Sequence, residues 1–141
     1  MEEIKLHYDV PGDDFTRAGE ASADLKSRLK KLGIPSAAVR KVSIALYEGE
    51  INLAIHAGGG AIDVVIGGES LTMILSDHGP GIKDISLAMS EGFSTAPDEV
   101  RSLGFGAGMG LPNMKKYSDD FDIESQVGVG TNVTMKVYFD A

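Results

Sequence analysis

The chain has 141 residues, a formal net charge of −8 and no cysteine. This length suits one domain with its own core, the acidic charge argues against nucleic-acid and membrane binding, and disulfides and thiolate metal sites are excluded. No apolar run approaches the roughly 18–20 residues of a membrane span, and the Met1-Glu2-Glu3 start does not resemble a signal peptide, so a cytoplasmic protein is expected.

The first part of the chain predicts a strand followed by two helices. Residues 4–10 alternate apolar and polar side chains, as half-buried strands do. A helix capped by Asp13 or Asp14 is then expected to run up to Gly33, which is a typical helix end signal. A second helix is expected over residues 36–57.

Glycine punctuates the second part of the chain, since fourteen of its 18 glycines lie at or after Gly58. The expected elements there are strands 61–66 and 71–75, an irregular segment 76–111 with a short helical stretch near 85–89, a helix 112–117, and strands 121–127 and 132–139. This order predicts an α/β (α+β) two-layer sandwich with a mixed, largely antiparallel sheet and helices on one face.

Three polar residues share one stripe of the second helix. Glu48, Asn52 and His56 follow one another at intervals of four residues. A carboxylate in this setting can activate a hydroxyl or a water, while the amide oxygen can bind a hard cation. The alternative is a solvated polar face. Glu50 is two residues from Glu48, so it should point to another side of the helix and is not expected to be catalytic.

A short turn motif, Asp77-His78-Gly79-Pro80-Gly81-Ile82, directly follows the expected strand 71–75. A carboxylate at a strand end can accept a hydrogen bond from an exocyclic amine. Glycine lets the backbone approach a flat ligand closely. The alternative is an ordinary turn, because Asp, Gly and Pro all favour turns.

Two further glycine segments follow. Residues 104–111 alternate glycine with other residues before a helix, an arrangement that offers N–H groups to an anion or, alternatively, forms a mobile linker. Its spacing is not that of a dinucleotide-binding fold, and it lacks the Gly-Lys-Ser/Thr of a P-loop. Residues 128–131 form either a plain hairpin turn or a turn that places the Thr131 hydroxyl near a base.

The order and spacing of these four segments resemble the GHKL (Bergerat-fold) ATPases, the superfamily of gyrase, histidine kinases and mismatch-repair ATPases. The resemblance covers roughly residues 36–139, and it implies one histidine-kinase-like ATPase domain over residues 1–141. The short length and the Glu-x-x-x-Asn-x-x-x-His pattern look most like the bacterial anti-sigma factor serine/threonine kinases. Such kinases tend to carry an arginine just before Gly-Met-Gly, where this chain has Phe105, Gly106 and Ala107.

The resemblance also implies a role for each motif. Glu48 would polarise the attacking serine hydroxyl, Asn52 would hold Mg²⁺, and Asp77 would receive the adenine amine. Residues 104–110 would close over the phosphates as a lid. The implied nucleotide-binding set is Asn52, His56, Asp77, Gly79, Gly81, Ile82, Gly104, Gly106, Gly108, Met109, Gly110, Leu111 and Thr131.

The function implied by this resemblance is that of an ATP-binding anti-sigma regulatory factor. With Mg²⁺ and ATP it would phosphorylate a serine of an anti-anti-sigma (STAS-type) partner, and it would also bind a sigma factor and could form a homodimer. Neither direct nucleic-acid binding nor membrane binding is expected. Two alternatives are a noncatalytic ATP-sensing interaction module and a stand-alone histidine-kinase-type ATPase domain.

Overall fold

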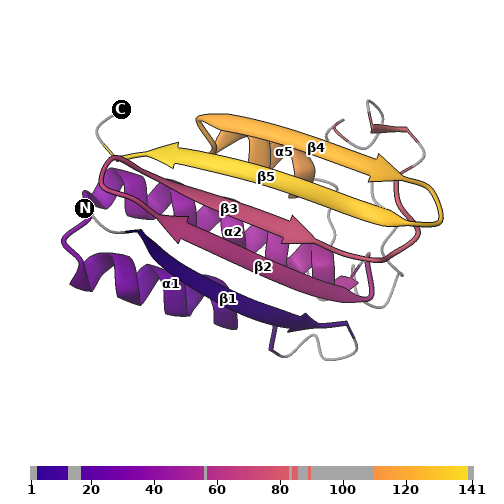
Figure 1. Ribbon diagram of the computed structural model, residues 1–141, viewed down its shortest axis with the longest axis horizontal. Coiled ribbons are helices and arrows are strands. Elements are labelled where there is room, and N and C mark those ends of the chain that lie inside the picture. Colours follow the sequence, from indigo (N-terminus) through magenta and orange to yellow (C-terminus); the bar gives the residue numbers. More distant parts are fainter. Residues whose placement is uncertain are drawn as a thin grey trace.

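A computed structural model describes residues 3–12, 17–55, 57–82, 84–85, 89 and 110–139. Within these residues a five-stranded sheet forms one layer, and helices cover one of its faces (Figure 1). The elements are β1 (Ile4–Pro11), α1 (Glu20–Lys31), α2 (Ser36–Ile55), β2 (Gly59–Ile66), β3 (Ser70–Ser76), α5 (Gly110–Lys116), β4 (Asp120–Gln126) and β5 (Gly130–Tyr138). The predicted two-layer sandwich is therefore confirmed.

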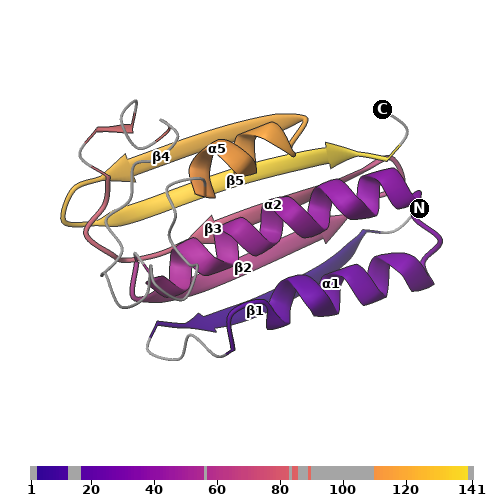
Figure 2. The ribbon, with the colours of Figure 1, turned by 180° about the vertical axis from the view of Figure 1, so that it is seen from behind.

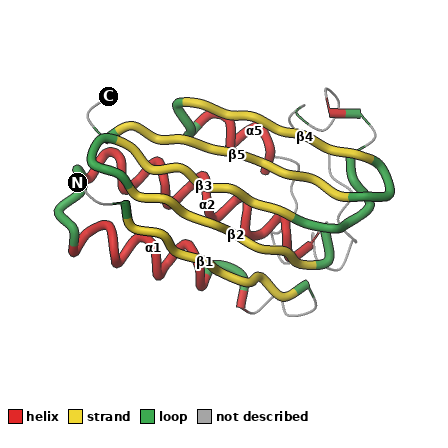
Figure 3. The backbone as a smooth tube through the Cα atoms, viewed as in Figure 1, coloured by secondary structure: helices red, strands yellow, loops and turns green. Residues whose placement is uncertain are grey.

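The sheet order is β1-β2-β3-β5-β4 (Figure 3), and every strand pairing among the described residues is antiparallel. The prediction of a mixed sheet was wrong in this respect. A parallel pair needs a crossover that returns the chain to the same end of the sheet. Here β1 and β2 are joined through the α1–α2 helix pair, and β2–β3 and β4–β5 are hairpins. The fourth pair, β3–β5, is also antiparallel, because α5 and β4 come between these two strands in the chain.

Helix α2 occupies the middle of the helical layer, with α1 on one flank and α5 on the other (Figure 2). Its apolar stripe faces the sheet, and Val42 and Leu46 are fully buried. Met73 and Met135 are fully buried from the sheet side, as the alternation of inward and outward side chains along a strand requires. In the described part of the chain, no helix is long and apolar enough to cross a membrane.

The start of α1 differs from the prediction. The helix begins at Glu20 after Gly19, and Asp13 and Asp14, the expected caps, lie outside the described residues. Instead, the buried carboxylate of Glu50 on α2 accepts hydrogen bonds from the backbone N–H groups of Ala21 and Ser22, each 3.0 Å long. A residue of α2 therefore performs the capping that a local side chain usually provides.

Gly49 lies inside α2, where glycine costs about 1 kcal/mol relative to alanine. A side chain at this position would overlap Leu75 of β3 and would lie 3.3 Å from the Met114 sulfur of α5. The close approach of three elements therefore explains the glycine. The same close packing holds in place the part of α2 that carries Glu48 and Asn52.

Candidate functional site

Glu48 and Asn52 lie one helical turn apart on α2, on the side that faces α5. A Cβ atom at Gly110, the first residue of α5, would lie 3.9 Å from Glu48 Oε2 and 4.0 Å from Asn52 Oδ1. The fold thus brings the end of the glycine-rich segment to the two polar side chains predicted on the helix. We call Glu48, Asn52, Gly110 and Asn113 the helix cluster.

The carboxyl group of Glu48 is half-buried at this place. Burial raises the pKa of Glu48 above its usual value, and a hydrogen bond from Asn113 Nδ2 to Glu48 Oε1 at 3.4 Å opposes part of that rise in pKa. A carboxylate with a raised pKa binds a proton more strongly, so it is a better general base than an exposed glutamate.

Asp77 follows β3 directly, as predicted, and its side chain organises the turn after the strand. Its Oδ1 accepts hydrogen bonds from the backbone N–H groups of Gly79 at 2.8 Å and of Thr131 at 3.2 Å. In the described part of the chain, both printed donors bond to Oδ1 and none bonds to the Oδ2 atom. Within the described residues, one carboxylate oxygen is therefore fixed, and the other keeps its capacity to accept a hydrogen bond from a ligand.

The turn that contains Gly81 and Ile82 packs onto the β4–β5 hairpin. The Ile82 N–H group donates to Ser125 Oγ at 2.7 Å, and that oxygen lies 2.7 Å from the hydroxyl oxygen of Thr131. A side chain at Gly81 would overlap the Gln126 backbone. We call Asp77, Gly79, Gly81, Ile82, Ser125 and Thr131 the turn cluster.

The two clusters adjoin through the end of α2. A Cβ atom at Gly79 would lie 2.9 Å from the carbonyl oxygen of Ala57, two residues beyond the last residue of α2. The same helix therefore carries Glu48 and Asn52 and borders the turn cluster at its end.

Sequence reasoning missed two polar residues of the site, Ser125 and Asn113. Ser125 stands opposite Thr131 in the β4–β5 register, so the expected hairpin could have indicated it. Asn113 lies three residues after Gly110 on α5, and its contact with Glu48 depends on how that helix packs against α2.

The remaining predicted site residues divide into two groups. Leu111 is buried in the core, and Ile82 is partly buried against that core. Five predicted residues lie outside the described residues: His56, Gly104, Gly106, Gly108 and Met109.

The helix cluster offers oxygen donors from Glu48 and Asn52. Mg²⁺ prefers such donors, is usually held by few protein oxygens and completes its shell with phosphate and water. No group of three acidic, histidine or cysteine side chains that could hold a metal occurs within the described residues. The donor set therefore fits a magnesium ion that is shared with a phosphate ligand.

Comparison with known families gives one matching model, described as the histidine kinase-like ATPase domain, over residues 13–137. The serine/threonine-protein kinase RsbT of Bacillus subtilis is 34% identical over 108 residues, which are 74% of this chain and 75% of that protein. An anti-sigma F factor of Clostridium acetobutylicum is 35% identical over 144 residues, covering 97% of this chain and 92% of that protein.

Solved structures show the same fold. A Mycobacterium tuberculosis chain with RsbU and RsbW domains aligns with a TM-score of 0.65 at 15% identity, over 98% of this chain and 34% of that chain. The mycobacterial sensor histidine kinase MprB aligns with a TM-score of 0.54 at 17% identity, over 96% and 97% of the two chains. At these identities the likeness concerns the fold alone.

Proposed function

The chain belongs to the histidine kinase-like ATPase (GHKL) family, among relatives that include RsbT and anti-sigma F factors, and from this premise we propose that it is a serine protein kinase. In this proposal, it binds ATP with Mg²⁺ and transfers the terminal phosphoryl group to a serine of an anti-anti-sigma (STAS-type) partner. It also binds a sigma factor, works in the cytoplasm, and acts as one domain over residues 1–141, alone or as a homodimer.

The observation that carries the proposal is the convergence of Glu48 and Asn52 on the start of α5. Phosphoryl transfer needs little covalent chemistry from the protein, since most of the catalysis comes from positioning and charge stabilisation. The half-buried carboxylate of Glu48 would position the attacking hydroxyl, and the amide of Asn52 would hold the metal ion that stabilises the phosphate charge. Both side chains lie next to the segment expected over the phosphates.

The turn cluster supports adenine binding. The Oδ2 atom of Asp77, to which no described residue donates, can accept a hydrogen bond from the exocyclic amine of adenine, and the bonds from Gly79 and Thr131 to Oδ1 hold the carboxylate in place. Gly81 lets the backbone pass close to a flat ring. His56, Gly104, Gly106, Gly108 and Met109 complete the proposed nucleotide-binding set.

In the transfer step, Glu48 accepts the proton of the attacking serine hydroxyl. The serine oxygen forms a bond to the terminal phosphorus, and the bond from that phosphorus to the bridging oxygen breaks and leaves ADP. Asn52 would hold Mg²⁺ through its Oδ1 atom, and the ion would supply the positive charge near the phosphates that a chain of net charge −8 lacks.

Incubation with radiolabelled ATP, Mg²⁺ and small candidate partner proteins encoded next to this chain tests the proposal. We expect acid-stable phosphate on a partner serine, lost in Glu48→Gln and retained in Glu124→Gln, a matched change on the exposed side of β4. Nucleotide binding without transfer to any partner would favour an ATP-sensing module instead. Acid-labile phosphohistidine would favour a histidine-kinase-type domain.

A further inference from the structure

A groove of about 500 Å³ lies between the second half of α1 and the first half of α2. We call it the helix groove. Its apolar floor includes Val39, which is 3% exposed, and the partly buried Ile34 and Ile44. Glu48 and Asn52 belong to the other half of α2, so the groove is separate from the candidate site.

Three exposed cations line this groove: Lys26, Lys30 and Arg40. The groove has no acidic lining residue, and in the described part of the chain none of the three cations forms an ion pair. The adjacent Arg28 and Lys41, by contrast, are neutralised by Asp24 and Asp119. Three positive charges without an ion pair among the described residues thus line one groove of an acidic protein.

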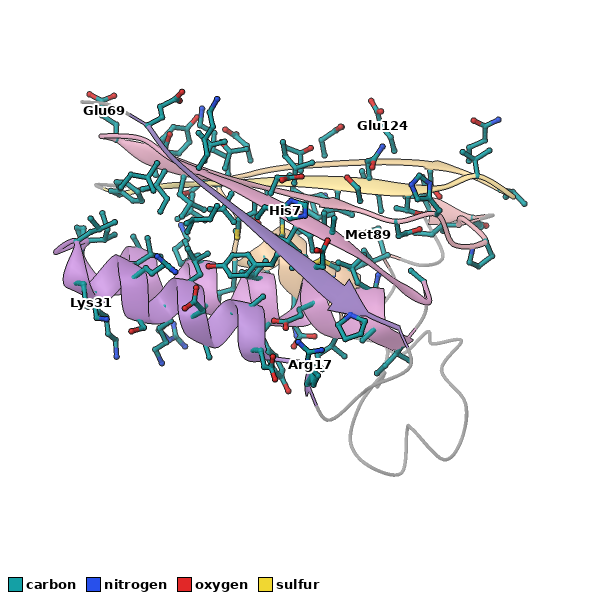
Figure 4. The ribbon with its side chains drawn as sticks, turned by 60° about the horizontal axis from the view of Figure 1, so that its bottom comes forward. His7, Arg17, Lys31, Glu69, Met89 and Glu124 are labelled. Atoms are coloured by element: carbon teal, nitrogen blue, oxygen red, sulfur yellow. The ribbon has the colours of Figure 1, made fainter. Side chains whose placement is uncertain are left out.

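The positive charge continues beyond the groove. The Arg40 guanidinium lies 5.9 Å from the centre of the Tyr117 ring, and the Lys116 ammonium lies 5.4 Å from the same centre. The opposite side of the molecule is different, because the exposed side chains of β4 include Asp120, Asp122 and Glu124. Figure 4 shows Glu124 on the open face of the sheet and Lys31 on the helical side.

We infer that the helix groove docks an acidic, amphipathic helical segment of a partner protein. Apolar side chains three or four residues apart on such a helix would rest on the floor formed by Ile34, Val39 and Ile44. Acidic side chains beside them would meet Lys26, Lys30 and Arg40, so the charges of the two surfaces are complementary. A nucleic-acid backbone could meet the cations but would leave the apolar floor without a partner.

The test uses the full chain and a fluorescent synthetic peptide, an amphipathic helix with leucine on one face and glutamate on the other. Fluorescence anisotropy should show saturable binding that weakens at least about tenfold in the double variant Lys26→Glu/Lys30→Glu. The control Lys5→Glu/Lys136→Glu changes the charge equally on the open face of the sheet and should bind the peptide as the wild type does. Circular dichroism checks that both variants are folded.

Amide chemical shifts in the labelled protein should change along the groove when the peptide is added, and ATP affinity should be equal in all three proteins. This last readout separates failure of the groove from failure of the proposed kinase function. No binding, equal loss in the control variant, or equal binding of a peptide with lysine in place of glutamate would overturn the inference. So would tighter binding of a short DNA duplex, or a dimer of the chain that dissociates only in Lys26→Glu/Lys30→Glu.

Discussion

The turn cluster and the helix cluster hold their polar groups in different ways. In the turn cluster, Asp77 Oδ1 and Ser125 Oγ each join separate segments through hydrogen bonds of 2.7–3.2 Å. In the helix cluster, Glu48 accepts one hydrogen bond from the described residues, a long one of 3.4 Å from Asn113. A fixed turn suits recognition of a rigid base, whereas loosely bonded side chains can still bind a metal, a phosphate or a hydroxyl.

Replacing Glu48, the proposed general base, should separate the roles of the two clusters most strongly. We expect Glu48→Gln to lower the rate of phosphoryl transfer by roughly 10²–10⁴-fold, the usual contribution of a general base. ATP affinity should stay nearly unchanged, because the proposed contact of Glu48 is with the serine hydroxyl and not with the nucleotide. Single-turnover transfer and calorimetric ATP binding measure the two quantities. An equal loss of both would show that the clusters do not divide the work in this way.

Changing the turn cluster should produce the opposite pattern. Asp77→Asn replaces a charged acceptor by an amide, and we expect ATP affinity to fall by about 10–100-fold, or about 1.5–3 kcal/mol, the range for a hydrogen bond to a charged group. Calorimetry gives the affinity, and Asp122→Asn on the exposed side of β4 is the matched control. Unchanged affinity in Asp77→Asn would remove the adenine assignment.

Glu50 lies two residues from Glu48 but should affect stability instead of transfer. Its buried carboxylate caps α1, so Glu50→Gln should lower the free energy of unfolding by about 1.5–3 kcal/mol. Urea denaturation measures this change. At a temperature where the variant is folded, its transfer rate should match that of the wild type, and a selective loss of transfer would assign Glu50 to the catalytic machinery instead.

The contrast between Glu48 and Glu50 also shows what sequence patterns can predict. Helical spacing is local, so it correctly separated the two carboxylates and aligned Glu48 with Asn52. The predicted start of α1 was wrong, because the side chain that caps this helix is Glu50, which lies on a different helix. The strands could be predicted from their own alternation, but their direction depends on how distant segments are connected, so the mixed sheet was wrong as well.

In the candidate site, too, local sequence patterns predict single motifs but not the contacts between distant segments. Asp77 and its glycines stand out as a contiguous motif, and the structure brings Asp77 to Thr131. The role of Ser125 depends on strand register, and the contact of Asn113 with Glu48 depends on helix packing. Neither relation is visible in a local pattern.

Ser125 allows a milder test of the rigidity of the turn cluster. Ser125→Ala leaves the Ile82 N–H group without its acceptor, so we expect a loss of stability of about 1 kcal/mol, the typical net value of one hydrogen bond. ATP affinity should fall by less than in Asp77→Asn, since the carboxylate stays in place. Ser70→Ala, at the other end of the sheet, is a suitable control. A larger loss of affinity than in Asp77→Asn would mean that Ser125 contacts the nucleotide directly.

The smallest expected effect is on the pH dependence of stability, through the weakly hydrogen-bonded Glu48 of the helix cluster. Burial raises the pKa of Glu48 in the folded chain, so the folded state binds a proton more readily than the unfolded state does. Stability then decreases as pH rises from the unfolded pKa through the folded pKa, and the full penalty is present above the folded pKa. Glu48→Gln removes this penalty, so the variant should be more stable than the wild type near neutral pH. The gain should be below about 1 kcal/mol, because solvent screens the half-exposed carboxylate.

Urea denaturation of both proteins at several pH values should show the gain in stability shrinking on acidification. The transfer rate of the wild type should fall over the same pH range as Glu48 becomes protonated. A gain that grew at low pH would contradict the raised pKa, and with it the account of Glu48 as a base set by burial.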